Sequence, residues 1–153
     1  MRLTTYSDYA LRLLMYLAVR TDGLSTIPEV AKAYGISVNH LMKVAHDLGL
    51  AGYVTTVRGR GGGMRLGRAP EDIGLGEVVR STEPDLDIVP CFDSHNRDCP
   101  LWRACRLKGA LERARMAFFE VLDEYTLADL TSNPGPMRAL LGAQMHDGTG
   151  ADG

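Results

Sequence analysis

The chain has 153 residues, of which 45% are hydrophobic, and its formal net charge is −2. This length and composition allow one domain with a buried core, or a small domain with an appended element. No run of about eighteen apolar residues occurs, which excludes a membrane-spanning helix. The first residues are basic and then apolar, as in a signal peptide, but Asp8 and Arg12 interrupt the apolar stretch. We therefore expect a cytoplasmic protein with reduced thiols.

The charge is distributed unevenly along the chain. Residues 1–68 contain nine Lys and Arg against four Asp and Glu, a net of +5, and residues 69–153 contain eight against fifteen, a net of −7. A basic first half joined to an acidic remainder is typical of a polyanion-binding module linked to another element.

The first half of the chain predicts a helix-turn-helix. Residues 7–20 place Leu11, Leu14, Met15 and Ala18 at helical spacing, with Ser7 as the expected N-cap. Thr26 is expected to cap a short helix over 28–34 that ends at Gly35. Ser37 is expected to cap a second helix that runs to about residue 48.

The polar face of that second helix is the predicted DNA-reading face. Its core side chains are expected to be Leu41, Val44, Ala45 and Leu48, which leaves Asn39, His40, Met42 and Lys43 pointing outward. Amide, imidazole, hydroxyl and ammonium groups match base edges and phosphates. We therefore expect Ser37, Asn39, His40 and Lys43 to contact DNA, although such a set also suits an ordinary solvated face.

A β-hairpin is predicted directly after the helix-turn-helix. Residues 53–57 are β-branched and aromatic, the tip RGRGGG covers 58–63, and 64–66 would return. A helix-turn-helix followed by such a hairpin makes a winged helix, and Arg58 and Arg60 at the tip suit the narrow, electronegative minor groove. A simple flexible hairpin is the alternative.

The remainder predicts a loop and a long helix. Residues 71–83 should form a short helix, 83–100 a loop, and 101–125 the longest helix. Apolar residues recur along that helix in steps of four and three, which is typical of a dimerisation seam: Leu107, Leu111, Ala114, Phe118, Val121 and Tyr125. A two-fold partner would cover this seam; packing against the chain's own winged helix is the alternative.

All three cysteines lie in one fifteen-residue stretch, as C-x7-C-x5-C: Cys91, Cys99 and Cys105. An odd number cannot pair fully into disulfides within the chain, and three thiolates are one short of the usual four ligands of zinc or an iron–sulfur cluster. His95 could complete a structural Cys3His zinc site. An iron–sulfur cluster and unmetallated thiols are the other possibilities. Cys105 as a nucleophile with His95 as base lacks an oxyanion-hole motif, so we do not expect an enzyme.

The sequence also resembles a known family over residues 1–142. The segments MRLTTYSDYALRLLMYLA, NHLMKV, GYVTTVRGRGGGMRLG, CRLKGAL and YTLADL are similar to those of NsrR-type nitric-oxide-sensing repressors, which belong to the bacterial winged-helix iron–sulfur regulators together with IscR and RirA. The resemblance implies a homodimer that binds operator DNA and takes nitric oxide as its signal. It also implies one [4Fe-4S] cluster per subunit, bound by Cys91, Cys99, Cys105 and, from the other subunit, Asp8. On the residues alone, Asp8 would be a helix N-terminal carboxylate favoured by the helix dipole.

One departure leaves an alternative signal open. The seven residues between Cys91 and Cys99, and the segment IPEVAKAYG, resemble the iron-responsive regulator RirA. A [2Fe-2S] cluster or zinc are the alternative cofactors. The predicted fold is mainly α, a winged helix-turn-helix domain (1–83) with a cluster loop (84–100), a dimerisation helix (101–130) and a tail (131–153) whose end we expect to be disordered.

Overall fold

The computed structural model describes residues 2–20 and 22–142. The elements follow in the order α1 Thr5–Val19, α2 Ile27–Tyr34, α3 Val38–Leu50, β1 Val54–Val57, β2 Gly63–Leu66, η1 Pro70–Asp72, α4 Leu75–Thr82, η2 Pro90–Phe92, α5 Arg106–Asp123, α6 Leu127–Leu130 and α7 Pro134–Leu141. The expected disorder at the end of the chain concerns residues outside this range. No helix in the described part is long and apolar enough to cross a bilayer.

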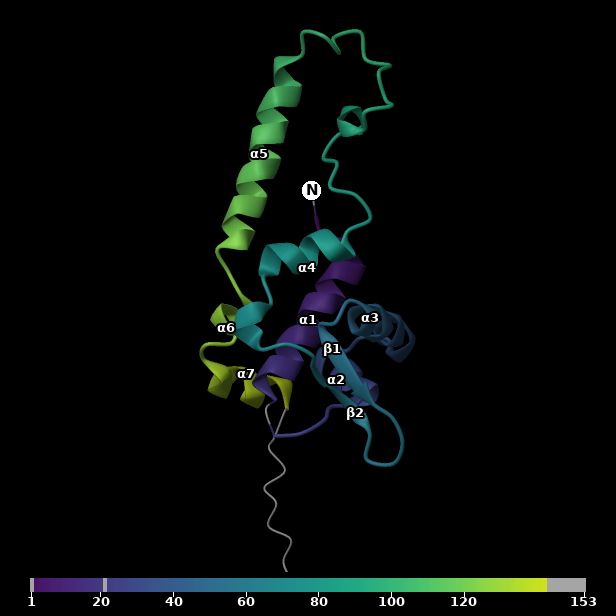
Figure 1. The fold of residues 1–153 in the computed structure, drawn as a ribbon, viewed down its shortest axis with the longest axis vertical. Coiled ribbons are helices and arrows are strands. Elements are labelled where there is room, and N and C mark those ends of the chain that lie inside the picture. Colours follow the sequence, from purple (N-terminus) through teal and green to yellow (C-terminus); the bar gives the residue numbers. More distant parts are fainter. Residues whose placement is uncertain (1, 21, 143–153) are drawn as a thin grey trace, which may run out of the picture.

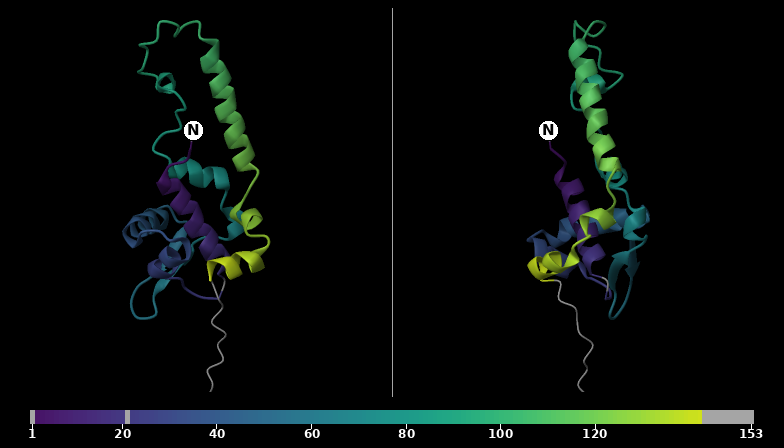
Figure 2. Two further views of the ribbon diagram at one scale, coloured as in Figure 1. Left: turned by 180° about the vertical axis from the view of Figure 1, so that it is seen from behind. Right: turned by 90° about the vertical axis from the view of Figure 1, so that its left-hand side faces the viewer.

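The molecule consists of a lobe and an arm. Figure 1 shows α1 to α4, the hairpin, α6 and α7 gathered in the lobe, while α5 and the loop that leads into it project away as a thin arm. Figure 2 shows the same arm edge-on, with the loop running back beside α5. The predicted class, mainly helical with a winged helix and a long C-terminal helix, is confirmed.

The core lies in the lobe around α1. Ala10, Leu13, Leu14 and Leu17 of α1 are almost fully buried, and they pack with buried residues of the helix-turn-helix and the hairpin. Of the face expected for α1, Leu14 is fully buried, while Leu11, Met15 and Ala18 are partly buried and pack against the core. The N-cap is Thr4 rather than Ser7, because the Thr4 side chain accepts from the Ser7 backbone N–H while Ser7 itself is buried.

The helix-turn-helix forms as predicted. Thr26 and Glu29 make a reciprocal capping box at the start of α2, and Gly35 ends the helix in the left-handed conformation, φ +65°. Leu41, Val44, Ala45 and Leu48 of α3 are buried, as expected. Ser37 occupies the N-cap position of α3, but its side chain makes no capping hydrogen bond.

The hairpin is antiparallel, with Thr55 opposite Arg65 and Val57 opposite Gly63. Ser25 extends this small sheet through two hydrogen bonds with Met64, of 2.7 and 2.9 Å. The helix expected over 71–83 begins later, at Leu75, because Pro70–Asp72 form a separate turn and Ile73 and Gly74 adopt extended backbone.

The long helix is shorter than expected and begins at Arg106 rather than Leu101. The preceding residues form turns, in which the Trp102 backbone N–H donates to the Cys99 carbonyl. The Cys105 sulfur caps the helix by accepting from the Lys108 backbone N–H at 3.4 Å. After Asp123 the chain returns to the lobe, where Arg138 of α7 donates to the Val19 carbonyl at the end of α1 (2.5 Å).

Loss of the α2 capping box should destabilise the lobe. We expect Thr26→Ala to lower the free energy of unfolding by about 1 kcal/mol, because the Glu29 backbone N–H loses the Thr26 hydroxyl as its partner and Glu29 loses one hydrogen bond to its carboxylate. Urea denaturation followed by circular dichroism measures the change. Thr5→Ala, at an exposed threonine of α1, is the control, and equal stability of the two variants would contradict the capping argument.

Candidate nucleic-acid interface and metal loop

The outer face of α3 presents polar side chains to solvent. Ser37, Asn39, His40 and Lys43 are all exposed, as are Met42 and His46. His40 stacks loosely on Tyr9 of α1, with the ring centroids 6.3 Å apart. These side chains therefore occupy the surface position that the helix-turn-helix pattern predicts.

A hydrogen-bonded group ties this face to α1. The Tyr6 hydroxyl donates to the Asp47 carboxylate at 2.6 Å, and Lys43 Nζ donates to the same carboxylate at 3.1 Å. Burial and this hydrogen bond raise the pKa of Tyr6 to about 12, and the Tyr6 hydrogen bond and Lys43 hold the pKa of Asp47 below its usual range. Lys43 is thus partly neutralised where it stands, and its ammonium would have to leave Asp47 to reach a phosphate.

The wing tip exposes its arginines on a tight turn. Arg58 and Arg60 are exposed, and in the described part of the chain neither takes part in an ion pair. Gly59 and Gly61 have positive φ, and a Cβ at Gly62 would lie 2.3 Å from the Val57 carbonyl oxygen. The glycine run is therefore required by the turn itself, and only the arginines remain as candidates for DNA contact.

The base of the wing is held by α4. Glu77 Oε1 accepts from the Tyr53 hydroxyl (2.9 Å) and from Arg68 Nη2 (3.0 Å). Burial alone would raise the pKa of Glu77, but the Arg68 and Tyr53 hydrogen bonds outweigh it and lower that pKa. Both ends of the hairpin are thereby attached to one carboxylate.

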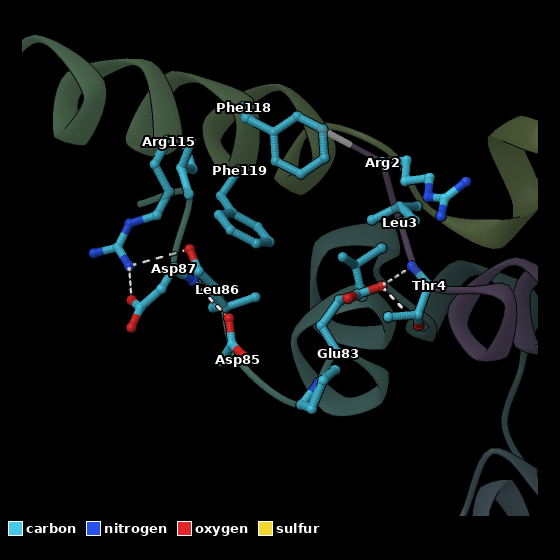
Figure 3. A pocket seen from close by; sticks show the side chains of 13 residues that line it. Arg2, Leu3, Thr4, Glu83, Asp85, Leu86, Asp87, Arg115, Phe118 and Phe119 are labelled. Atoms are coloured by element: carbon cyan, nitrogen blue, oxygen red, sulfur yellow. Dashed lines mark hydrogen bonds and ion pairs between the residues drawn. The ribbon is translucent and has the colours of Figure 1, made fainter. Parts of the chain in front are cut away.

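The cysteine loop lies at the tip of the arm. All three cysteines are free thiols: Cys91 lies in η2 and is partly buried, Cys99 is exposed, and Cys105 is the N-cap of α5. Arg115 holds the base of the loop against α5, since it donates to the Leu86 carbonyl at 3.3 Å and lies 4.8 Å over the Phe92 ring. Figure 3 shows Arg115 reaching toward Leu86 and Asp87.

The single chain does not assemble a finished metal site. Among residues 2–20 and 22–142, no three His, Cys, Asp or Glu side chains lie close enough together to hold a metal ion. His95 is 92% exposed and pairs with Asp93 at 3.1 Å, so it does not turn toward the thiols. The chemistry of the donor set fits a thiolate-bound metal group, because three free thiols share one loop, but the loop must close around that group.

Asp8 lies in the lobe, in the first turn of α1. Its half-exposed carboxylate pairs with Arg12 Nε at 3.0 Å, and Arg12 lies 5.7 Å from the Tyr34 ring of α2. The cysteine loop lies on the projecting arm, whereas α1 begins beside α4, where the arm leaves the lobe (Figure 1). Asp8 and the thiols of one chain are therefore not neighbours.

The two sides of α5 differ in what they contact. One side faces its own chain through Arg115, Phe119 and Asp123. Of the predicted seam, Leu107 is 65% exposed and Val121 54%, and Ala114 is exposed, whereas Leu111 and Phe118 are half-buried. Phe118 lines a cavity together with Leu3 and Glu83. The two ends of the seam are therefore open to solvent, and its middle partly contacts the chain's own lobe.

The comparisons with known proteins decide the family. Residues 3–133 match the family model Rrf2, described as iron-dependent transcriptional regulator. The chain belongs to the Rrf2 family. It is 53% identical over 142 residues to the HTH-type transcriptional regulator NsrR of Bacillus subtilis, an alignment that covers 92% of this chain and 97% of that relative.

Other relatives agree with this assignment. Protein aau3 of Rhizobium meliloti is 46% identical over 94% of both chains. Among solved structures, the cysteine regulator CymR of B. subtilis superposes with a TM-score of 0.71 at 28% identity, covering 86% of this chain and 97% of that one. T. potens IscR gives 0.69 at 28% identity, covering 97% and 94%. This Rrf2 chain is therefore a DNA-binding transcriptional regulator and not an enzyme.

Removal of a wing arginine should weaken DNA binding. We expect Arg60→Ala to reduce affinity for double-stranded DNA and to lower the slope of log affinity against log salt by about one, because one phosphate or minor-groove contact is lost. Fluorescence anisotropy at several salt concentrations measures both. Arg113→Ala, at an exposed arginine of α5, is the control, and unchanged affinity of Arg60→Ala would argue against a role for the wing.

Proposed function

We propose that this Rrf2 regulator is a homodimeric repressor that senses nitric oxide through a [4Fe-4S] cluster and releases operator DNA in response. The observation that carries the proposal is the free cysteine triad at the tip of an arm, in a chain 53% identical to a regulator named NsrR. Regulators of this family such as NsrR and IscR bind iron–sulfur clusters. The resemblance to nitric-oxide-sensing repressors supplies the signal.

The exposed seam supports a second copy as the partner. A helix with 18 residues is about 27 Å long, and a stripe of apolar side chains of that length is unfavourable in water. We propose that the seams of two protomers pack against each other, with Leu107, Leu111, Ala114, Phe118 and Val121 at the contact.

An antiparallel pairing would also join the two halves of the metal site. The C-terminal end of α5 is attached to its own lobe, and the N-terminal end carries Cys105. When two such helices run antiparallel, the cysteine loop of one protomer comes to the lobe of the other. Asp8 would then meet the partner's thiols, which supports its assignment as the fourth ligand.

The four proposed ligands would differ in how strongly they bind the cluster. Cys91, Cys99 and Cys105 supply soft thiolates, and Asp8 supplies a harder, weaker oxygen ligand. When bound, the cluster supplies iron with which nitric oxide reacts. Arg12 orients the Asp8 carboxylate by its 3.0 Å ion pair, and Asp8 links the partner's loop to the lobe that carries α3. Loss of that link would change the distance between the two α3 helices. Two half-sites about 34–36 Å apart can be bound together only when this distance is kept.

We propose that Ser37, Asn39, His40 and Lys43 enter the major groove and that Arg58 and Arg60 enter the adjacent minor groove. Their exposure on α3 and on the wing tip supports this assignment. An iron-responsive regulator of the RirA type is the second candidate, favoured by the seven residues between Cys91 and Cys99.

Nitric oxide should abolish DNA binding by the cluster-bearing protein. We expect the anaerobically purified chain to be straw-brown, and titration with nitric oxide to bleach it and to remove the gel shift on DNA that the wild type selects from a random library. Asp8→Ala should bleach faster, because a ligand is missing, and Asp72→Ala, at an exposed carboxylate of the same lobe, should behave as wild type.

Other outcomes would decide against nitric oxide. A colourless chain that carries zinc would favour the structural site. Release of DNA by iron chelation, with little effect of nitric oxide, would favour the RirA-type function. Equal bleaching of Asp8→Ala and wild type would remove Asp8 from the ligand set.

A charge in the seam should dissociate the dimer. We expect Val121→Glu to be a folded monomer at concentrations where the wild type is dimeric, because a carboxylate would have to enter an apolar contact. Sedimentation velocity measures the state. Met116→Glu is a matched control, since Val121 and Met116 are both 54% exposed on α5 but lie on different sides of the helix. A dimeric Val121→Glu would contradict the proposed interface.

A further inference from the structure

Helix α4 stands between the arm and the wing, and both attach to it through polar side chains. On its arm side, Arg80 donates two hydrogen bonds to the Asp123 carboxylate at the end of α5, at 2.6 and 2.7 Å. The Arg80 guanidinium also lies 4.5 Å over the Phe119 ring. A bidentate pair of this kind fixes orientation as well as distance.

Close backbone contact reinforces the junction between α4 and α5. Gly76 is buried, and a Cβ there would lie 1.9 Å from Asp123 Oδ1. The Leu75 N–H donates to the Tyr125 carbonyl at 2.9 Å, and the Leu127 N–H donates to the Ile73 carbonyl at 2.8 Å. The start of α4 is thus joined to the end of α5 by main chain and side chain together.

The wing side of α4 is attached through Glu77, one residue after Gly76. Glu77 accepts from Tyr53, which immediately precedes β1, and from Arg68, which follows β2 by two residues. The Arg68 guanidinium covers the Tyr53 ring at 4.3 Å, and the Gly67 N–H donates to the Tyr53 carbonyl at 2.8 Å. The two ends of the hairpin therefore move with α4.

We infer that α4 sets the position of each wing relative to α5, with Gly76, Glu77, Arg80 and Asp123 as positioning residues that fix which half-site spacing the dimer accepts. The inference rests on the proposed homodimer, because only a two-fold pairing of α5 converts the angle between wing and arm into a distance between two wings. None of these four residues needs to touch DNA.

The geometry makes spacing sensitive to this junction. Adding one base pair between half-sites moves them about 3.4 Å apart along the DNA and turns them by about a tenth of a turn. A lobe whose α4 is loosened from α5 can turn on the arm and carry its wing along with that displacement, whereas a lobe held to α5 by the Arg80–Asp123 pair cannot. Because isolated surface ion pairs contribute little to stability, loss of the Arg80–Asp123 pair should change spacing selectivity far more than folding.

Two variants release the junction in different ways. Asp123→Asn keeps the shape of the side chain but removes the charge that Arg80 binds. Gly76→Ala places a methyl group where Asp123 Oδ1 lies, so that the carboxylate must leave Arg80, while alanine favours the helical conformation of α4 more than glycine does. Glu112→Gln is the control, because Glu112 pairs with Arg115 within α5 at 2.6 Å and does not link α5 to α4.

The test is selection of binding sites from random double-stranded DNA, followed by anisotropy on selected sites whose central spacing is lengthened or shortened by a base pair. We expect the wild type and Glu112→Gln to prefer one spacing by about tenfold or more. In Asp123→Asn and Gly76→Ala the preference should fall to about twofold, with the half-site sequence, the dimeric state and the melting temperature of Gly76→Ala retained.

The outcomes separate the inference from the proposed function. A wild type with a sharp spacing preference that both variants retain would overturn the inference and leave the dimeric repressor intact. A wild type that selects single, unpaired half-sites would overturn the dimer and the inference together. A spacing preference lost equally in Glu112→Gln would show that any loss of an ion pair on α5 has this effect, which contradicts a role for α4.

Discussion

The exposed apolar stripe along α5 is the constraint on which the rest of the assembly depends. The chain meets its own α5 through polar and aromatic contacts, of which the bidentate Arg80–Asp123 pair, at 2.6 and 2.7 Å, has the best geometry, while Arg115 donates to the Leu86 carbonyl at 3.3 Å. Those contacts hold the arm away from the lobe and leave Leu107 and Val121 in water. The longest helix therefore has no buried residue of its own within the described part of the chain.

This arrangement separates the three thiols from the predicted DNA-reading face within one protomer. The thiols lie at the tip of the arm, whereas α3, the wing and Asp8 lie in the lobe. In the proposed homodimer, the thiols of one chain and Asp8 of the other chain lie close together, although the same groups are separated within one chain. A ligand set shared in this way makes cofactor binding and dimer geometry thermodynamically linked, so that each stabilises the other.

Much of the lobe could be predicted from sequence, because its signals are local. The Thr26 cap, the Gly35 stop and the buried face of α3 depend on residues a few positions apart, and the structure confirms them. The misplaced elements had competing signals: Thr4 and Ser7 are both good caps, and only tertiary burial of Ser7 decides between them. The delayed start of α4 depends on the pairing of Gly74 with Thr126, which no local pattern reveals.

The positions of the three thiols in space also could not be predicted, since loop geometry is not encoded in their spacing. The positioning residues on α4 were missed because their partners lie far away in sequence; the tight approach at Gly76 carries no signal beyond a glycine inside a helix.

The glycine turn at the wing tip has a consequence for how DNA is entered. Its backbone is already folded, with the Gly62 N–H bonded to the Gly59 carbonyl at 3.0 Å, and fixing one disordered residue would otherwise cost about 1–2 kcal/mol. In the proposed complex with DNA, the main chain of the tip is preorganised, and only the side chains of Arg58 and Arg60 have to become ordered on binding. Such a wing tip would fit grooves of slightly different width through its side chains, while its backbone keeps the same direction of approach.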